Sequence, residues 1–154
     1  METVLEFMGN DHDRLDAIFQ QYRKEKKNDM GKALGFFHHF KVGLQKHIVW
    51  EEEILFPLFE EKTGTKSHGP TFVMREEHRQ IKGFLEKIHD AFKENKSPQD
   101  SLDEGLLEVL GAHNEKEESI LYPWIDNEAS EQDREAAFQQ MESLPPEKYN
   151  LCCG

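Results

Sequence analysis

A histidine followed four residues later by a glutamate occurs twice in this chain, inside two segments that match position by position. The segments are residues 47–57 and 113–123, and each continues from its glutamate through an Ile-Leu pair to a proline. Residues four apart lie on one face of a helix, one turn from each other. Each segment therefore predicts a helix that presents an imidazole beside a carboxylate. The repeated pairs are His47 with Glu51 and His113 with Glu117.

Apolar residues at alternating steps of three and four extend from both pairs and recur in two further segments, a spacing typical of amphipathic helices. The stripe around the first pair contains Phe40, Leu44, Ile54 and Leu58, and the stripe around the second contains Leu106, Leu110, Ile120 and Trp124. No alternating, strand-like pattern competes with them. Each of the four stripes carries one histidine: His12, His47, His78 and His113.

Capping and breaking residues set the expected helix limits. Thr3 and Glu6 form a capping box, although Gly9-Asn10 leaves a start at Asn10 open. Further starts are expected at Asn28-Asp29, at Pro70, at Ser97-Pro98, and at Ser130 with Asp133 for a short helix to Glu142, while Pro57 should kink the second helix. The prediction is an all-α, up-down-up-down four-helix bundle over residues 1–128. Residues 129–154 are expected to form a short extra helix and a flexible tail.

Charge and composition narrow the expected partners. The formal net charge of −12 disfavours nucleic acid and anionic membranes, because both would repel the chain. No apolar run is long enough to span a bilayer, and no signal peptide is visible at the N-terminus. Cys152 and Cys153 are adjacent at the C-terminus and cannot cross-link the fold, so we expect a reducing, cytoplasmic location. The sequence leaves the oligomeric state open.

The histidines and glutamates of the stripes predict a metal site inside the bundle. A single stripe histidine is more often a hydrogen-bonded core residue, and one His-x-x-x-Glu is often an exposed pair. Four histidines on four stripes with a duplicated glutamate favour ligands, since unpaired buried carboxylates cost several kcal/mol. Imidazole and carboxylate ligands suit iron, with zinc and manganese as alternatives. The double Glu-x-x-His of ferritin-like sites is not met, because it occurs only once, at Glu86–His89.

These motifs together resemble the hemerythrin HHE cation-binding family over roughly residues 3–128. The matching pieces are Asn10-Asp11-His12, the two His-x-x-x-Glu-Glu segments with their Leu-Phe-Pro and Leu-Tyr-Pro ends, and Glu77-His78. The resemblance implies a bundle around two non-heme iron ions. It assigns His12 and His47 to one ion and His78 and His113 to the other. Glu51 and Glu117 would bridge the ions, with an oxo or hydroxo group completing the bridge.

Two departures from the oxygen-carrying members bear on function. Met74 stands where the carriers have a second third-helix histidine, and Glu117 stands where they have an aspartate. A thioether is a poor ligand for iron, so we expect Met74 to pack and the second ion to be open or to recruit Glu77. The related iron–sulfur repair proteins usually carry an extra N-terminal segment with a cysteine, and this chain is expected to lack it.

The expected function is therefore binding or sensing of dioxygen, nitric oxide or iron. A di-iron oxidase or peroxidase, an iron-donating repair protein and a metal-stapled scaffold stay open as alternatives. Whether the protein is an enzyme is also open, with binding favoured. Several acidic residues near the motifs should form a solvated face, from which one could orient a ligand histidine: Glu52, Glu53, Glu76 and Glu118. The histidines expected at the surface are His38, His39, His68 and His89.

Overall fold

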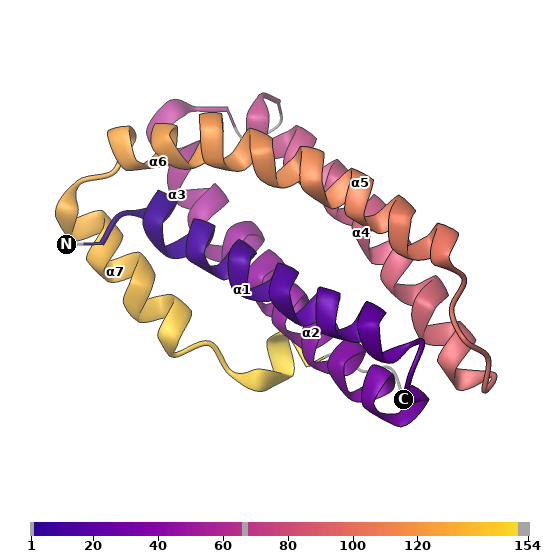
Figure 1. Ribbon diagram of the computed structural model, residues 1–154. Helices are drawn as coiled ribbons and strands as arrows, with labels where there is room; N and C mark the ends of the chain where they lie inside the picture. The colour runs from indigo at the N-terminus through magenta and orange to yellow at the C-terminus, as the bar shows by residue number, and fades with distance from the viewer. Residues whose placement is uncertain (1, 66–67, 151–154) are drawn as a thin grey trace.

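Four long helices form two antiparallel hairpins that pack side by side in the computed structural model, which describes residues 2–65 and 68–150 (Figure 1). The first hairpin pairs α1 (Val4–Glu25) with α2 (Met30–Trp50), and the second pairs α4 (Pro70–Lys93) with α5 (Asp100–Lys116). The described residues contain no strand. The predicted all-α four-helix bundle is thereby confirmed.

Local capping explains most helix limits. Thr3 and Glu6 form the predicted capping box, and α1 runs unbroken through Gly9-Asn10, so the alternative start at Asn10 is wrong. A second capping box between Ser130 and Asp133 opens α7 (Glu131–Glu142), as predicted.

The predicted start of the fourth long helix at Ser97-Pro98 is wrong, because α5 begins at Asp100. Pro98 is buried, and its carbonyl oxygen accepts a hydrogen bond from Lys26 Nζ at 2.7 Å. This contact holds Pro98 in the connecting turn. Asp100 and Asp103 then occupy the first helical turn, where negative charge is favourable.

Both repeated segments contain a π-helical turn directly after the His-x-x-x-Glu pair. The first spans Glu51–Leu55 and leads into α3 (Phe56–Thr63), and the second spans Glu117–Leu121 and leads into α6 (Tyr122–Glu128). The backbone N–H of the residue before each proline donates to the carbonyl oxygen of the site glutamate, five residues earlier. The predicted kink at Pro57 is thus a widened turn that the helix passes through.

A π turn adds one residue to the helical repeat, so it shifts every later position of the apolar stripe by one. Ile120 and Trp124, which regular spacing places on the fourth stripe, are 56% and 39% exposed. Their C-terminal neighbours Leu121 and Ile125 are buried instead, together with Tyr122. The prediction for this end of the stripe is therefore wrong by one residue. The same shift buries Leu55, Phe56 and Phe59 in the first segment.

The core consists of two apolar clusters, one on each side of the layer of four histidines. Met8, Trp50 and Met74 belong to the first cluster, and Leu15, Phe40 and Ile81 to the second. The buried histidines and glutamates therefore lie in one layer of the bundle, between the two apolar clusters.

The C-terminal part of the chain packs against the first cluster. Ala137 and Met141 of α7 are buried in it, and Trp50 Nε1 donates to the carbonyl oxygen of Met141 at 3.2 Å. The described part of the predicted tail places Tyr149 against Lys46 Nζ, 5.1 Å from the ring centroid. Cys152 and Cys153 lie outside the described residues.

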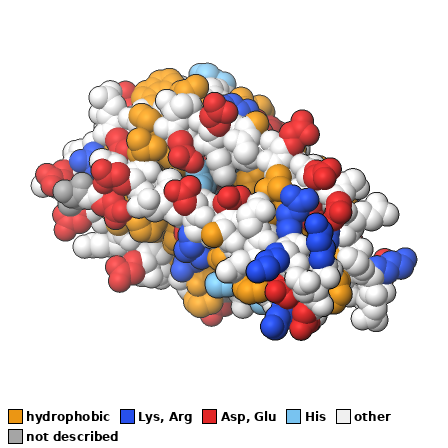
Figure 2. Space-filling view, in the orientation of Figure 1, with side chains coloured by type: hydrophobic (Ala, Val, Ile, Leu, Met, Phe, Trp, Pro, Cys, Tyr) orange, Lys and Arg blue, Asp and Glu red, His pale blue; other side chains and the backbone are white. Residues whose placement is uncertain are grey.

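Acidic side chains are scattered across the visible face, and several lysines and arginines gather towards the end of α1 (Figure 2). None of the helices in residues 2–65 and 68–150 combines the length and the apolar character needed to cross a bilayer.

Candidate metal centre

The six predicted ligand residues meet in the histidine layer. The four histidines are at most 5% exposed, and Glu51 and Glu117 are completely buried. Every histidine directs its Nε2 atom at a glutamate. The distances are 3.0 Å for His78 to Glu51, 3.2 Å for His12 to Glu117, 3.3 Å for His113 to Glu117 and 3.8 Å for His47 to Glu51.

The inner atoms divide into two overlapping groups whose members lie within 4.8 Å of one another. One group consists of Glu51, His78, His113 and Glu117, and the other of His12, His47 and Glu117. This division follows the histidine pairs that the family resemblance implies. Glu117 belongs to both groups, so its carboxylate lies within 4.8 Å of a ligand atom of each of the four histidines.

The outer nitrogen of each histidine contacts a carboxylate from a different helical segment. The Nδ1 distances are 2.9 Å for His12 to Glu118, 2.8 Å for His47 to Asp11, 2.6 Å for His78 to Glu52 and 2.8 Å for His113 to Glu77. A carboxylate at Nδ1 accepts the imidazole proton, so Nε2 of the neutral ring turns a lone pair inwards. Four such pairs are the arrangement that orients histidine ligands around a metal ion.

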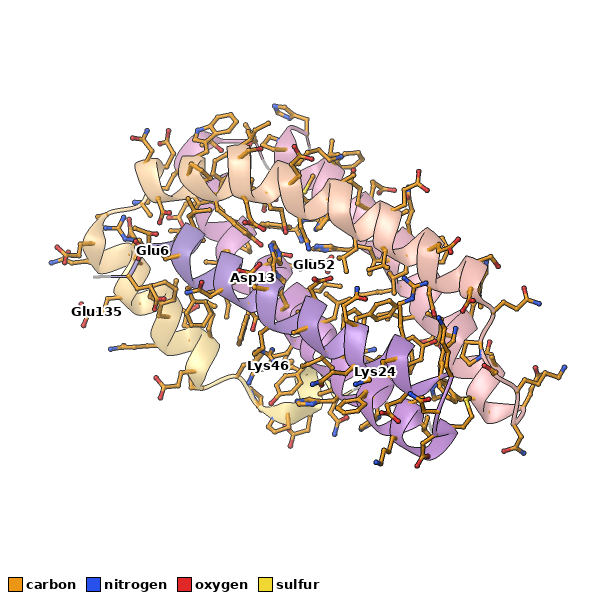
Figure 3. All side chains as sticks on the ribbon, viewed as in Figure 1. Glu6, Asp13, Lys24, Lys46, Glu52 and Glu135 are labelled. Carbon is orange, nitrogen blue, oxygen red and sulfur yellow. The ribbon has the colours of Figure 1, made fainter. Side chains whose placement is uncertain are left out.

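Of these four outer acids, the sequence predicted Glu52 and Glu118 as residues that could orient a ligand histidine. It did not predict this role for Asp11 and Glu77. Glu52 lies among the side chains between the helices in Figure 3, whereas Glu135 projects from α7. Asp11 was missed because it precedes His12 in sequence but contacts His47 on α2, a pairing that depends on how the hairpin packs. The two other candidates pair elsewhere, Glu53 with Lys148 and Glu76 with Arg79.

The structure shows where Glu77 and Met74, both on α4, lie relative to the histidine layer. Glu77 lies on the outer side of His113, where its second carboxylate oxygen pairs with Lys116. It therefore acts on the outer nitrogen and is not directed at the Met74 position. Met74 is 3% exposed within the first apolar cluster, as expected for a packing residue. The remaining histidines lie outside the layer, with His38, His39 and His68 exposed and His89 half-buried.

The inner carboxylates titrate in opposite directions. Burial and the neighbouring charge of Glu117 raise the pKa of Glu51. Burial alone would also raise the pKa of Glu117, but interactions with Glu51, His113 and His12 hold it well below its usual range. Burial would lower the pKa of His12, yet hydrogen bonding to Glu117 raises it to about 9. Protons on the histidines thus balance the charge of Glu117, and a bound cation would take the place of those protons and leave the rings neutral.

A buried tyrosine that the sequence analysis missed reaches the centre of the layer. Tyr122 is fully buried, and its Oη lies 2.6 Å from Glu51 Oε2 and 2.9 Å from Glu117 Oε1. The same atom lies 3.2 Å from His47 Nε2 and 3.3 Å from His12 Nε2. Regular helical spacing predicts that Ile120 points inwards at this position. Tyr122 points inwards instead because the π turn shifts the spacing by one residue.

An unpaired buried oxygen tests whether the layer suits a metal ion. Glu117 Oε2 has no hydrogen-bond partner although it lies 3.3 Å from His113 Nε2. A buried carboxylate oxygen without a donor is costly, and an imidazole lone pair facing it gives no compensation. A cation between these atoms would satisfy both, so the residues fit a metal ion.

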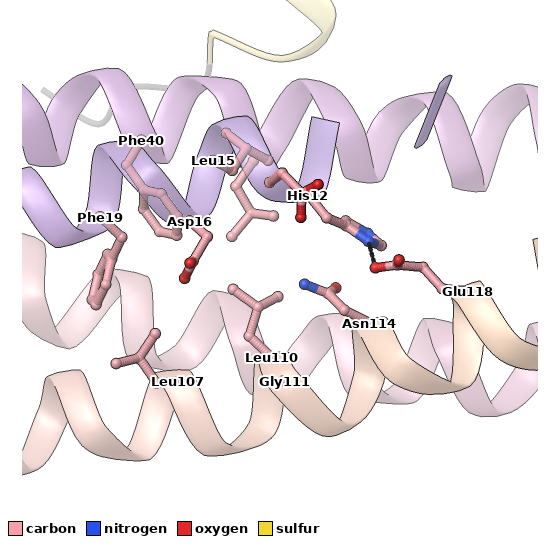
Figure 4. A pocket seen from close by; sticks show the side chains of 12 residues that line it. His12, Leu15, Asp16, Phe19, Phe40, Leu107, Leu110, Gly111, Asn114 and Glu118 are labelled. Carbon is pink, nitrogen blue, oxygen red and sulfur yellow. Dashed lines mark hydrogen bonds and ion pairs between the residues drawn. The ribbon is translucent and has the colours of Figure 1, made fainter. Parts of the chain in front are cut away.

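A pocket of about 230 Å³ between α1 and α5 leads to the layer beside His12 (Figure 4). Its polar end is formed by His12, Asn114 and Glu118, with Asp16 further along its wall. The rest of the lining is largely apolar: Leu15, Phe19, Phe40, Leu44, Leu107 and Leu110. The pocket offers a small apolar molecule a place next to one half of the layer.

Fold and site together define a helical-bundle protein with a buried histidine–carboxylate site that fits a metal. The family model described as the hemerythrin HHE cation-binding domain matches residues 3–125. The chain belongs to this family.

Two relatives give the family match more detail. An uncharacterized hemerythrin-like protein of Schizosaccharomyces pombe is 29% identical over 126 residues, which cover 77% of this chain and 62% of that protein. The iron-sulfur cluster repair protein YtfE of Edwardsiella ictaluri is 47% identical over 45 residues, which cover 29% of this chain and 20% of that protein. The chain thus spans less than two thirds of either relative. No solved structure matches it significantly.

Proposed function

We propose that the protein holds two non-heme iron ions in the histidine layer and uses them to bind a small diatomic molecule, dioxygen or nitric oxide. The observation that carries the proposal is the double pairing of each histidine, with a carboxylate at Nδ1 and a glutamate at Nε2. This pairing directs four lone pairs at two buried glutamates, a donor set that suits iron.

In this proposal His12 and His47 hold one ion, His78 and His113 hold the other, and Glu51 and Glu117 are shared. Iron, when bound, supplies reversible ligand binding and electron transfer. The protein residues orient the imidazoles through Asp11, Glu52, Glu77 and Glu118 and exclude bulk water with the two apolar clusters. The pocket beside His12 admits an uncharged diatomic molecule and disfavours anions because of Asp16 and Glu118.

The test starts from purified protein loaded with ferrous iron without oxygen. Addition of nitric oxide or dioxygen should change the optical spectrum, and removal of the gas should reverse the change. Loss of peroxide without such a reversible change would favour the oxidase or peroxidase alternative. A colourless protein that retains zinc or manganese after expression in iron-rich medium would contradict the proposal.

A second candidate, donation of iron to a repair process, is favoured by the similarity to the repair protein from Edwardsiella ictaluri. Under this alternative the loaded protein should pass iron to an acceptor protein faster than to a small chelator of equal affinity. Retention of both ions in the presence of the acceptor would exclude donation and leave ligand binding. The cytoplasmic location stays a prediction from the sequence.

A further inference from the structure

The two halves of the histidine layer offer unequal numbers of ligands. One group contains four candidate ligand residues, whereas the group of His12, His47 and Glu117 contains three. Tyr122 enters the poorer half, since its Oη lies 2.9 to 3.3 Å from an atom of each of the three members. Its contact in the other group is with Glu51 Oε2, at 2.6 Å.

The hydrogen-bonding capacity of a phenol does not account for these contacts. Tyr122 Oη has one proton, which it can donate to Glu51 or to Glu117. With a metal ion in the layer, His12 and His47 would keep a single proton on Nδ1, where Glu118 and Asp11 accept it, and each ring would turn an Nε2 lone pair inwards, beside the phenol oxygen. A positive ion among these four groups would turn every one of the contacts into an attraction.

The corresponding position in the first repeat carries no donor. Phe56 follows its π turn as Tyr122 follows the second, and its ring stacks on His78 with a centroid distance of 5.9 Å and an interplanar angle of 9°. The structure therefore places a phenol oxygen on one half of the layer and a hydrocarbon ring on the other.

We propose that Tyr122 is a direct ligand of the metal ion held by His12, His47 and Glu117. This inference rests on the proposed function, because it requires iron in the layer. Phenol oxygen is a hard donor that suits ferric iron, and tyrosine serves as an iron ligand elsewhere. On ligation an iron–oxygen bond forms, the phenol O–H bond breaks, and the proton passes to solvent. Tyr122 thus makes the two ions chemically different.

The experiment uses the full chain loaded with iron and oxidised in air. A tyrosinate ligand gives a visible phenolate-to-iron(III) charge-transfer band and tyrosine ring modes in the resonance Raman spectrum. The wild-type protein should show both, and Tyr122→Phe should lose both. Tyr22→Phe is the matched control, because Tyr22 is equally buried but bonds to Asp103. It should keep both signals.

Ring-deuterated tyrosine keeps the test valid if Tyr122→Phe fails to fold. The chain has three tyrosines. Tyr22 bonds to Asp103 and Tyr149 lies against Lys46, so isotope-shifted tyrosinate modes in the wild-type protein would identify Tyr122. A wild-type protein with two bound irons but without these modes overturns this inference alone. A protein that takes up no iron overturns the proposed function and the inference together.

Discussion

The two repeated segments, residues 47–57 and 113–123, fold alike and differ in the ring that each turns towards the histidine layer. Both contain a histidine, a buried glutamate and a π turn, and in both the residue before the proline is fully buried. That residue is Phe56 in the first segment and Tyr122 in the second. In both segments the π turn directs one additional side chain towards the site. The identity of that side chain determines what it adds to the chemistry of the site.

A second difference concerns the glutamates. Glu117 belongs to both ligand groups and contacts His12 and His113, whereas Glu51 belongs to one group. The pKa of Glu117 is lowered and that of Glu51 is raised, so the second segment carries the charged carboxylate. The two segments are alike in backbone but unequal as ligand donors.

Removal of the bound metal should have the largest effect, because it acts on both segments at once. We expect chelation to lower the melting temperature by roughly 5–10 °C, the range for a tightly bound ligand in a domain of this size. The loss follows because Glu51 and Glu117 would remain buried without a compensating cation. Differential scanning calorimetry with and without chelator measures it. An unchanged melting temperature would contradict a buried site.

Replacing one glutamate at a time compares how much each of the two segments contributes to metal binding. Glu117→Ala should remove nearly all bound metal, and Glu51→Ala more than half, because Glu117 lies within 3.3 Å of a histidine of each pair whereas Glu51 lies 3.8 Å from His47. Glu53→Ala is the control, since its partner is the exposed Lys148 and it should retain all metal. Metal analysis of the three variants decides the order. Equal retention in all three would show that the glutamates are not ligands.

Neutralising one outer carboxylate at a time should have a smaller effect. Asp11→Asn removes the partner of His47 Nδ1, and Glu77→Gln removes that of His113. Each should weaken metal binding by about 10–100-fold, because the imidazole loses its fixed orientation. Exposed Asp13, next to His12, provides the control Asp13→Asn. Competition with a coloured chelator gives the metal affinities. Wild-type affinity in both variants would show that Asp11 and Glu77 do not orient the histidine ligands.

The smallest effect is expected at Met74 on α4. Met74→Leu conserves volume in the first apolar cluster, so the metal content should stay the same and stability should change by less than about 1.5 kcal/mol. Chemical denaturation and metal analysis measure the two quantities. Loss of one ion per chain would identify the thioether as a ligand.

The sequence predicted the long helices and the six inner residues, because both depend on spacing along single helices. His47 and Glu51 are four apart, and their helical face follows directly from that distance. The inward turn of Tyr122 could not be predicted, since a π turn adds one residue to the repeat without any signal beyond the nearby proline. The pairing of Asp11 with His47 also escaped prediction, because it joins two helices whose packing sets the contact.

The central claim is that the histidine layer holds two iron ions in each chain. Elemental analysis of protein purified from iron-rich medium, combined with a Mössbauer spectrum of ⁵⁷Fe-loaded protein, tests it most directly. The account predicts two irons per chain and, because Tyr122 contacts the histidine pair of one half of the layer, two distinguishable iron signals of equal area. A single iron per chain, or zinc in both positions, would contradict it.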